Sequence, residues 1–184
     1  MKKPLIVQKF GGTSVGSIER IHQVAQHIIQ AKNSGNQVVV VVSAMSGETN
    51  RLLDLAKQVD SVPDARELDV LLAAGEQVSM ALLAMTLNKM GYKSRSLTGA
   101  QANIVTDNQH NDATIKHIDI SPITELLEQD QIVIVAGFQG ITERGDITTL
   151  GRGGSDTSAV TLAGALCADV CQICLLYTSD AADE

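Results

Sequence analysis

The sequence has almost no aromatic residues and few cysteines. Aromatic residues make up 2% of its 184 residues, and there is no tryptophan. Such a chain lacks the rings on which single-stranded nucleic acids or sugars stack, so binding of that kind is not expected. Three cysteines in a chain of this length do not form a disulfide framework, which favours a reducing, cytoplasmic environment.

A basic surface and long apolar runs are missing as well. Lysine and arginine number 14 against 21 aspartates and glutamates, which gives a net charge of −7. This balance argues against nucleic acid as the main partner. The valine run at residues 38–42 is far shorter than a membrane span. The apolar stretch near the N-terminus stops at Gln8, so it is too short for the core of a signal peptide. We therefore expect neither a membrane partner nor export.

The chain does contain a regular alternation of strand and helix patterns. Apolar residues make up 44% and charged residues 19% of it, as is typical of a globular domain. Continuous apolar runs such as residues 38–42 are typical of parallel strands covered on both faces. The pattern predicts an α/β fold, a three-layer sandwich with a mainly parallel central sheet, whose binding edge lies at the carboxyl ends of the strands. The predicted strands cover residues 4–10, 37–43, 92–97, 103–105, 131–136 and 170–173.

Helices are predicted between these strands. The first begins after Ser17 as its N-cap, and another opens at the Ser-Pro pair at residues 121–122. Two more are predicted at residues 51–59 and 65–90, the second interrupted by a glycine. Residues 138–151 are expected to form a long polar loop with a hairpin turn near its middle.

Lys9, Gly11 and Gly12 form the first candidate site, at the end of the first predicted strand. Glycines let backbone N–H groups approach an anion, and the next helix points its positive end the same way. Because the lysine adds a full positive charge, the pattern predicts a phosphate site. It is neither a P-loop, where the lysine follows the glycines, nor a dinucleotide fingerprint. An ordinary strand–helix turn with a surface lysine remains the alternative.

A second glycine-rich loop precedes the last predicted helix. Gly153 and Gly154 follow Arg152, and so little side chain around a guanidinium suits two-point contact with a carboxylate or phosphate. Ser155 is predicted to cap the helix, and the next residue, Asp156, could hold a metal or an amine. A flexible loop that ends in an ordinary helix cap remains the alternative.

Two further segments carry polar groups of interest. Ser43 and Thr49 belong to a loop of small residues after the valine strand, where hydroxyl groups suit a ligand, although an ordinary capped turn explains them better when taken alone. Glu76 lies in an apolar helical stretch and is a candidate partner for a buried amine, although a solvated helix charge is the simpler explanation. His22 and His27 are five residues apart, which does not suit a metal on one helix face, and we predict no metal-ligating residues.

The order and spacing of these segments together resemble bacterial aspartate kinases, of the amino-acid-kinase superfamily. The resemblance runs from about residue 4 to residue 173. It implies transfer of the γ-phosphate of ATP to the side-chain carboxylate of L-aspartate, which gives 4-phospho-L-aspartate and opens the route to lysine, threonine and methionine. Such transfer uses Mg²⁺ and depends on positioning and charge neutralisation. The matching segments are Lys-Phe-Gly-Gly-Thr-Ser (9–14), Val-Ser-Ala-Met-Ser (42–46), Gly-Glu (75–76) and Leu-Gly-Arg-Gly-Gly-Ser-Asp (150–156).

The resemblance also implies roles for the matching residues, and a homo-oligomer for the full-length enzyme. Glu76 is expected to contact the amine of aspartate and Arg152 a substrate carboxylate. The implied catalytic residues are Lys9 and Asp156. The implied ATP-binding residues are Lys9, Gly11, Gly12, Ser43 and Ser155. The implied substrate-binding residues are Thr49, Glu76, Arg152, Gly153 and Gly154.

The end of the chain departs from the family pattern. Residues 174–184 look like the in-frame translation of a sequencing-library adapter. We therefore expect a partial amino-acid-kinase catalytic domain at residues 1–173 and a non-native segment at residues 174–184. The family continues beyond this point into a strand and loop that hold adenine and ribose, and into regulatory domains. The resemblance therefore implies an N-terminal fragment with weak ATP affinity and little turnover.

Three other interpretations remain open. A sibling kinase would act on a glutamate derivative, a carbamate or a nucleotide, and a panel of substrates would identify it. A non-catalytic binding module would bind aspartate without ATP turnover. A dinucleotide-dependent oxidoreductase is the weakest, because the glycine fingerprint and the acidic ribose partner are both absent.

Overall fold

The predicted three-layer α/β architecture is confirmed in a computed structural model, which describes residues 1–151 and 153–176. Five strands form the central sheet in the order β3-β6-β2-β1-β9, and every neighbouring pair in it is parallel. These strands are β1 (Leu5–Phe10), β2 (Gln37–Val42), β3 (Ser94–Leu97), β6 (Ile132–Ala136) and β9 (Val170–Cys174).

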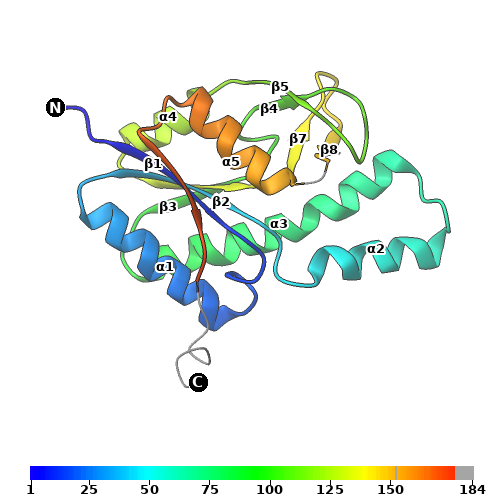
Figure 1. The fold of residues 1–184 in the computed structure, drawn as a ribbon, viewed down its shortest axis with the longest axis horizontal. Coiled ribbons are helices and arrows are strands. Elements are labelled where there is room, and N and C mark those ends of the chain that lie inside the picture. Colours follow the sequence, from blue (N-terminus) through cyan, green and yellow to red (C-terminus); the bar gives the residue numbers. More distant parts are fainter. Residues whose placement is uncertain (152, 177–184) are drawn as a thin grey trace.

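Helices cover both faces of this sheet, as Figure 1 shows. On one face lie α1 (Ile18–Asn33) and α3 (Ala65–Lys89), and on the other α4 (Ser121–Glu128) and α5 (Gly154–Ala165). The valines of β2 alternate between two cores: Val39 and Val41 pack with α4 and α5, whereas Val38, Val40 and Val42 pack with α1 and α3. An unbroken apolar run was therefore the right indication of a strand buried on both faces.

A second, smaller sheet lies beside the amino-terminal half of α3 (Figure 1). Its strand order is β5-β4-β7-β8, with one parallel pair between two antiparallel pairs. The segment expected to be a polar loop supplies two of its strands, joined by a hairpin turn in which Gly145 has a φ of +92°. The strands are β4 (Ile104–Thr106), β5 (Ile115–Ile118), β7 (Gln139–Ile141) and β8 (Ile147–Thr149).

The helices differ from the sequence-based expectations at three points. The remaining helix, α2 (Glu48–Val59), begins three residues before the predicted start. Gly75 does not interrupt α3; a Cβ there would lie 2.9 Å from the Cβ of Ala44, so the glycine allows close packing. The prediction of Ser155 as a helix cap was wrong, because α5 already starts at Gly154 and its N-cap is Gly153, in a left-handed conformation with a φ of +74°.

Helix α3 is long and apolar enough to cross a membrane by length and composition alone, which the run-based sequence analysis missed. Half of the most apolar 18-residue stretch of this helix is buried inside the fold. Its buried face also includes two carboxylates, Asp69 and Glu76. These features fit a helix in the core of an α/β domain better than a lipid-exposed helix.

The segment expected to be non-native overlaps the last strand. Cys174 is the final residue of β9 and lies opposite Phe10 of β1. Leu176 packs beside the core on the α1 side of the sheet. The expected boundary at residue 173 therefore falls within a strand, and residues 177–184 lie outside the described part of the chain.

Candidate active site

A cleft of about 620 Å³ opens at the carboxyl ends of β1, β2 and β6. This is the edge at which parallel α/β sheets bind ligands. Gly11 adjoins the cleft, and a Cβ added to it would lie 3.5 Å from Nζ of Lys9. Arg152, a predicted site residue, lies outside the described residues. The structure brings nine of the predicted residues to the lining: Lys9, Gly12, Ser43, Thr49, Glu76, Gly153, Gly154, Ser155 and Asp156.

Lys9 and Asp156 form an ion pair in this cleft. Lys9 Nζ lies 2.8 Å from Asp156 Oδ1. The lysine side chain is only 11% exposed, whereas that of the aspartate is 55% exposed. An ion pair whose carboxylate is exposed to water contributes little to stability. The lysine therefore brings an ammonium group into a cleft whose carboxylate partner can turn towards a ligand.

The two loops that follow β1 and β2 are joined at Gly12. The backbone N–H of Ser46 donates to the carbonyl oxygen of Gly12 at 3.1 Å. A Cβ on Gly12 would lie only 2.8 Å from the carbonyl oxygen of Ala44. Because any side chain would push the loops apart, glycine at this position keeps the floor of the cleft narrow.

Hydroxyl groups connect the valine strand to the helices on both sides of the sheet. Ser43 Oγ donates to Ser155 Oγ at 2.8 Å, which links the end of β2 to the first turn of α5. Ser79 Oγ of α3 donates to the carbonyl oxygen of Ser43 at 2.7 Å. Ser155 thus serves the cleft rather than the helix cap that the sequence predicted.

Glu76 is the most unusual ionisable group in the cleft. It is only 3% exposed, so the expectation of a solvated helix charge, taken from the residue alone, was wrong. Its Oε1 accepts a long 3.3 Å hydrogen bond from the backbone N–H of Ala44, and its Oε2 has no hydrogen-bond partner among the described residues. Burial raises the pKa of Glu76 to about 7, against the smaller lowering effect of backbone N–H donors.

Phe138 is a lining residue to which the sequence analysis assigned no role. Its φ is +69°, a conformation that bulky residues rarely adopt. Ser158 Oγ accepts from its N–H at 3.0 Å, and its carbonyl oxygen accepts from the N–H of Leu150 at 2.9 Å. Its ring lies so close to Gly154 that a Cβ there would clash with it. The Gly-Phe pair after a buried strand was the available sequence indication.

Asn111 and Asp112 were also missed, although both line the cleft. They lie in the loop between β4 and β5, far in sequence from every predicted motif. Asn111 has a φ of +68°. The Asp112 carboxylate lies against Gly151, where a Cβ would clash with Oδ1, so this loop packs directly on the start of the glycine loop.

Metal-ligating side chains are sparse in the described part of the chain. No group of three His, Cys, Asp or Glu residues there is arranged to hold an ion. Asp156 is the exposed carboxylate nearest the Lys9 ammonium. One carboxylate is enough for Mg²⁺ when the other ligands are water and substrate phosphate oxygens.

A comparison with protein-family models gives the family of this chain. The model described as the amino acid kinase family matches residues 4–175. The chain belongs to the amino acid kinase family. The resemblance inferred from four short segments is therefore confirmed over nearly the whole chain.

Curated relatives within this family carry the names aspartokinase and aspartate kinase. The chain is 60% identical to an aspartokinase of Geobacillus stearothermophilus over 169 residues, covering 92% of this chain and 42% of the relative. It is 58% identical to an aspartate kinase of Pseudomonas putida over 180 residues, covering 96% of this chain and 44% of the relative. The chain thus spans less than half the length of these relatives.

Solved structures give the same fold. An aspartate kinase from Synechocystis is 48% identical with a TM-score of 0.79, covering 92% of this chain and 27% of that chain. Aspartokinase III of E. coli, solved in complex with aspartate and ADP, is 24% identical with a TM-score of 0.76, covering 92% of this chain and 48% of that chain. The second likeness supports the amino-acid-kinase fold alone.

Proposed function

We propose that this chain is the N-terminal catalytic part of an aspartate kinase, which phosphorylates the side-chain carboxylate of L-aspartate with ATP. The observation that carries the proposal is the pairing of unlike charges in one cleft. Lys9 brings an ammonium group to it, and Glu76 brings a buried carboxylate with an unused acceptor oxygen. ATP offers phosphate groups to Lys9, and aspartate offers an ammonium group to Glu76. A complex with both substrates therefore satisfies both walls of the cleft. The names of the close relatives support the same activity.

Each wall of the cleft has a part in the proposed reaction. Lys9, with the backbone of Gly11 and Gly12, holds the phosphates and neutralises charge on the transferring group. Ser43 and Ser155, which are hydrogen-bonded to one another, lie by the nucleotide phosphates.

The aspartate side chain supplies the nucleophile. One of its carboxylate oxygens forms a bond to the γ-phosphorus while the bond to the bridging oxygen breaks, so that ADP leaves with the electron pair. A carboxylate needs no base to remove a proton, and none is assigned. The substrate contacts are assigned to Thr49, Glu76, Arg152, Gly153 and Gly154.

Mg²⁺ fits this arrangement through Asp156. Asp156 would hold the ion, which would neutralise phosphate charge. Asp156 is more than half exposed, so it can leave Lys9 to contact such an ion. Lys9 and Asp156 remain the two residues to which the proposal assigns catalytic roles.

The wider setting of the enzyme is also proposed from the family. The product is the first intermediate towards lysine, threonine and methionine, and the site of action is the cytoplasm. A homo-oligomer is expected for the full-length protein.

Residues 1–173 are proposed as the partial catalytic domain and residues 174–184 as the non-native segment. Removing residues 177–184 should then change the free energy of unfolding by less than about 0.5 kcal/mol, as a denaturant titration can measure.

Hydroxylamine trapping of the acyl phosphate tests the proposed activity. We expect little or no hydroxamate from the 184-residue chain with aspartate and ATP. Hydroxamate should form when the chain is extended with the C-terminal part of the Geobacillus relative. Phosphorylation of another carboxylate or of a carbamate, but not of aspartate, would identify a sibling kinase instead. Robust hydroxamate formation by the 184-residue chain would contradict the expectation of a fragment.

A further inference from the structure

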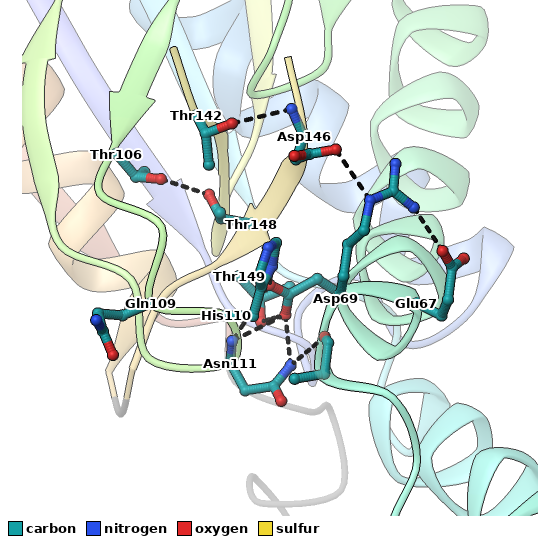
Figure 2. A network of polar contacts seen from close by, with 12 residues as sticks. Glu67, Asp69, Thr106, Gln109, His110, Asn111, Thr142, Asp146, Thr148 and Thr149 are labelled. Carbon is teal, nitrogen blue, oxygen red and sulfur yellow. Dashed lines mark hydrogen bonds and ion pairs between the residues drawn. The ribbon is translucent and has the colours of Figure 1, made fainter. Parts of the chain in front are cut away.

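A buried carboxylate outside the predicted motifs lies two helical turns before Glu76. Asp69 belongs to the same buried face of α3 and is fully buried. It does not line the cleft. A buried charge in this position is costly unless donors surround it, and the donors around Asp69 come from two different segments of the small-sheet region (Figure 2).

The first segment is the loop between β4 and β5. The backbone N–H of Asn111 donates to both carboxylate oxygens of Asp69, at 3.1 and 3.2 Å, and Asn111 Nδ2 donates to Oδ1 at 2.6 Å. His110 Nδ1 lies 2.6 Å from Oδ2. Since a carboxylate only accepts hydrogen bonds, Nδ1 of His110 carries the proton in this contact.

The second segment is β8. Thr149 Oγ1 donates to Oδ1 of Asp69, and Thr149 is followed by Leu150 and Gly151, which line the cleft. The two segments are also joined to each other, because the N–H of Ala113 donates to the carbonyl oxygen of Thr149 at 3.0 Å. Asp69 therefore fixes both segments that lead to the wall of the cleft.

We propose that Asp69 is a positioning residue: with His110, Asn111 and Thr149 it holds the Asn111–Asp112 wall and the start of the glycine loop in the place that aspartate binding requires. This inference rests on the proposed function for the identity of the ligand. The placement of the wall by Asp69 does not depend on that identity. The carboxylate acts through its neighbours and touches no reacting atom.

Two kinds of variant test this role in the 184-residue chain. Asp69→Ala removes every acceptor oxygen at once. His110→Phe removes one donor at a partly exposed position, where a folded product is easier to obtain, and His110→Asn keeps a donor near the place of Nδ1. The matched control is Thr148→Val, which breaks the buried Thr106–Thr148 hydroxyl contact in the same small sheet (Figure 2) without touching the cleft.

Calorimetric titration with L-aspartate and amide hydrogen exchange are the two readouts. Asp69→Ala should weaken aspartate binding roughly tenfold, the effect of losing one to two net hydrogen bonds, and should speed exchange at the Asn111 amide. His110→Phe should show a smaller loss of the same kind, and His110→Asn should restore the affinity. Thr148→Val should lower the melting temperature while aspartate affinity and Asn111 exchange stay unchanged.

The outcomes separate this proposal from the proposed function. Unchanged exchange at Asn111 in Asp69→Ala and His110→Phe would overturn the positioning role, whatever ligand the cleft takes. Faster exchange with unchanged aspartate affinity would overturn it too, because the wall would then be dispensable for binding. If the unaltered chain bound no aspartate, the proposed function would fail, whereas faster exchange at Asn111 in the variants would still support Asp69 as the residue that holds this wall.

Discussion

Two buried carboxylates on one face of α3 differ in how many hydrogen bonds they accept. Asp69, near the start of the helix, is surrounded by donors from the backbone and side chain of Asn111 and from His110 and Thr149. Glu76, two turns later, accepts one long hydrogen bond, and its Oε2 has no partner among the described residues. The carboxylate near the start of α3 therefore has a full set of hydrogen-bond donors, whereas the one two turns later lacks a donor for one of its oxygens.

This difference in hydrogen bonding indicates a different role for each carboxylate. A buried charge with a full set of donors stabilises one arrangement of the segments that donate to it. A buried carboxylate with an unused oxygen is costly, and its pKa rises in consequence, here to about 7. Such a cost is understandable when a ligand supplies the missing donor. Glu76 lines the cleft and Asp69 does not, in agreement with this division.

Lys9 tests whether a group that already has a partner can also bind a ligand, because it is paired with Asp156 and the proposed function gives it a catalytic role. If pairing with Asp156 were its only role, Lys9→Met would cost only the small energy of an ion pair whose carboxylate is exposed. We expect instead a loss of roughly 10²–10³ in kcat, the usual result of removing one group that stabilises transition-state charge. The measurement is turnover by the extended chain, with Lys32→Met as the control for loss of a paired lysine elsewhere. An effect confined to KM would restrict Lys9 to anchoring ground-state phosphate.

The fold was largely predictable from the sequence, whereas the comparison between the carboxylates was not. Continuous apolar runs identified β2 and β6, and glycine-rich loops identified the floor of the cleft. In the small sheet only β4 was predicted, because the three-residue strands β7 and β8 are too short to show an alternating pattern. Asp69 stands alone among helix-forming residues, so nothing in the sequence marks it as buried. Its partners lie about 40 and 80 positions away, a proximity that only the fold creates.

The pH dependence of aspartate binding sharpens the comparison. If Glu76 receives the substrate amine as a carboxylate, the protein must lose a proton to bind below pH 7. Aspartate affinity should then fall by up to about tenfold per pH unit below pH 7 and level off above it. The charged groups Lys9, Asp112 and Asp156 line the same cleft, so the assignment needs Glu76→Gln, in which this slope should disappear. A slope that survives in this variant would belong to one of those other groups.

Ser79 provides the smallest expected effect. It lies on the same face of α3, one turn after Glu76, and its hydroxyl is satisfied by the carbonyl oxygens of Ser43 and Glu76. Ser79→Ala should therefore behave as the loss of one ordinary hydrogen bond, with about 1 kcal/mol less stability. The pH dependence of aspartate binding should persist unchanged. Denaturant unfolding together with calorimetry at two pH values gives both quantities, and a changed slope would mean that Ser79 also sets the environment of the Glu76 carboxylate.

The most direct test of the central claim is to measure stability and aspartate affinity of Glu76→Gln at pH 8. Folding raises the pKa of Glu76 from 4.5 to about 7, so the folded chain holds the proton more tightly than the unfolded chain. The resulting stability is fully present below pH 4.5 and is lost as the pH rises through 7. At pH 8 the neutral glutamine should therefore raise the free energy of unfolding by roughly 3 kcal/mol, while aspartate affinity falls about 10- to 100-fold. A variant that lost stability and kept its affinity would show that Glu76 is a structural carboxylate like Asp69, and would contradict the account.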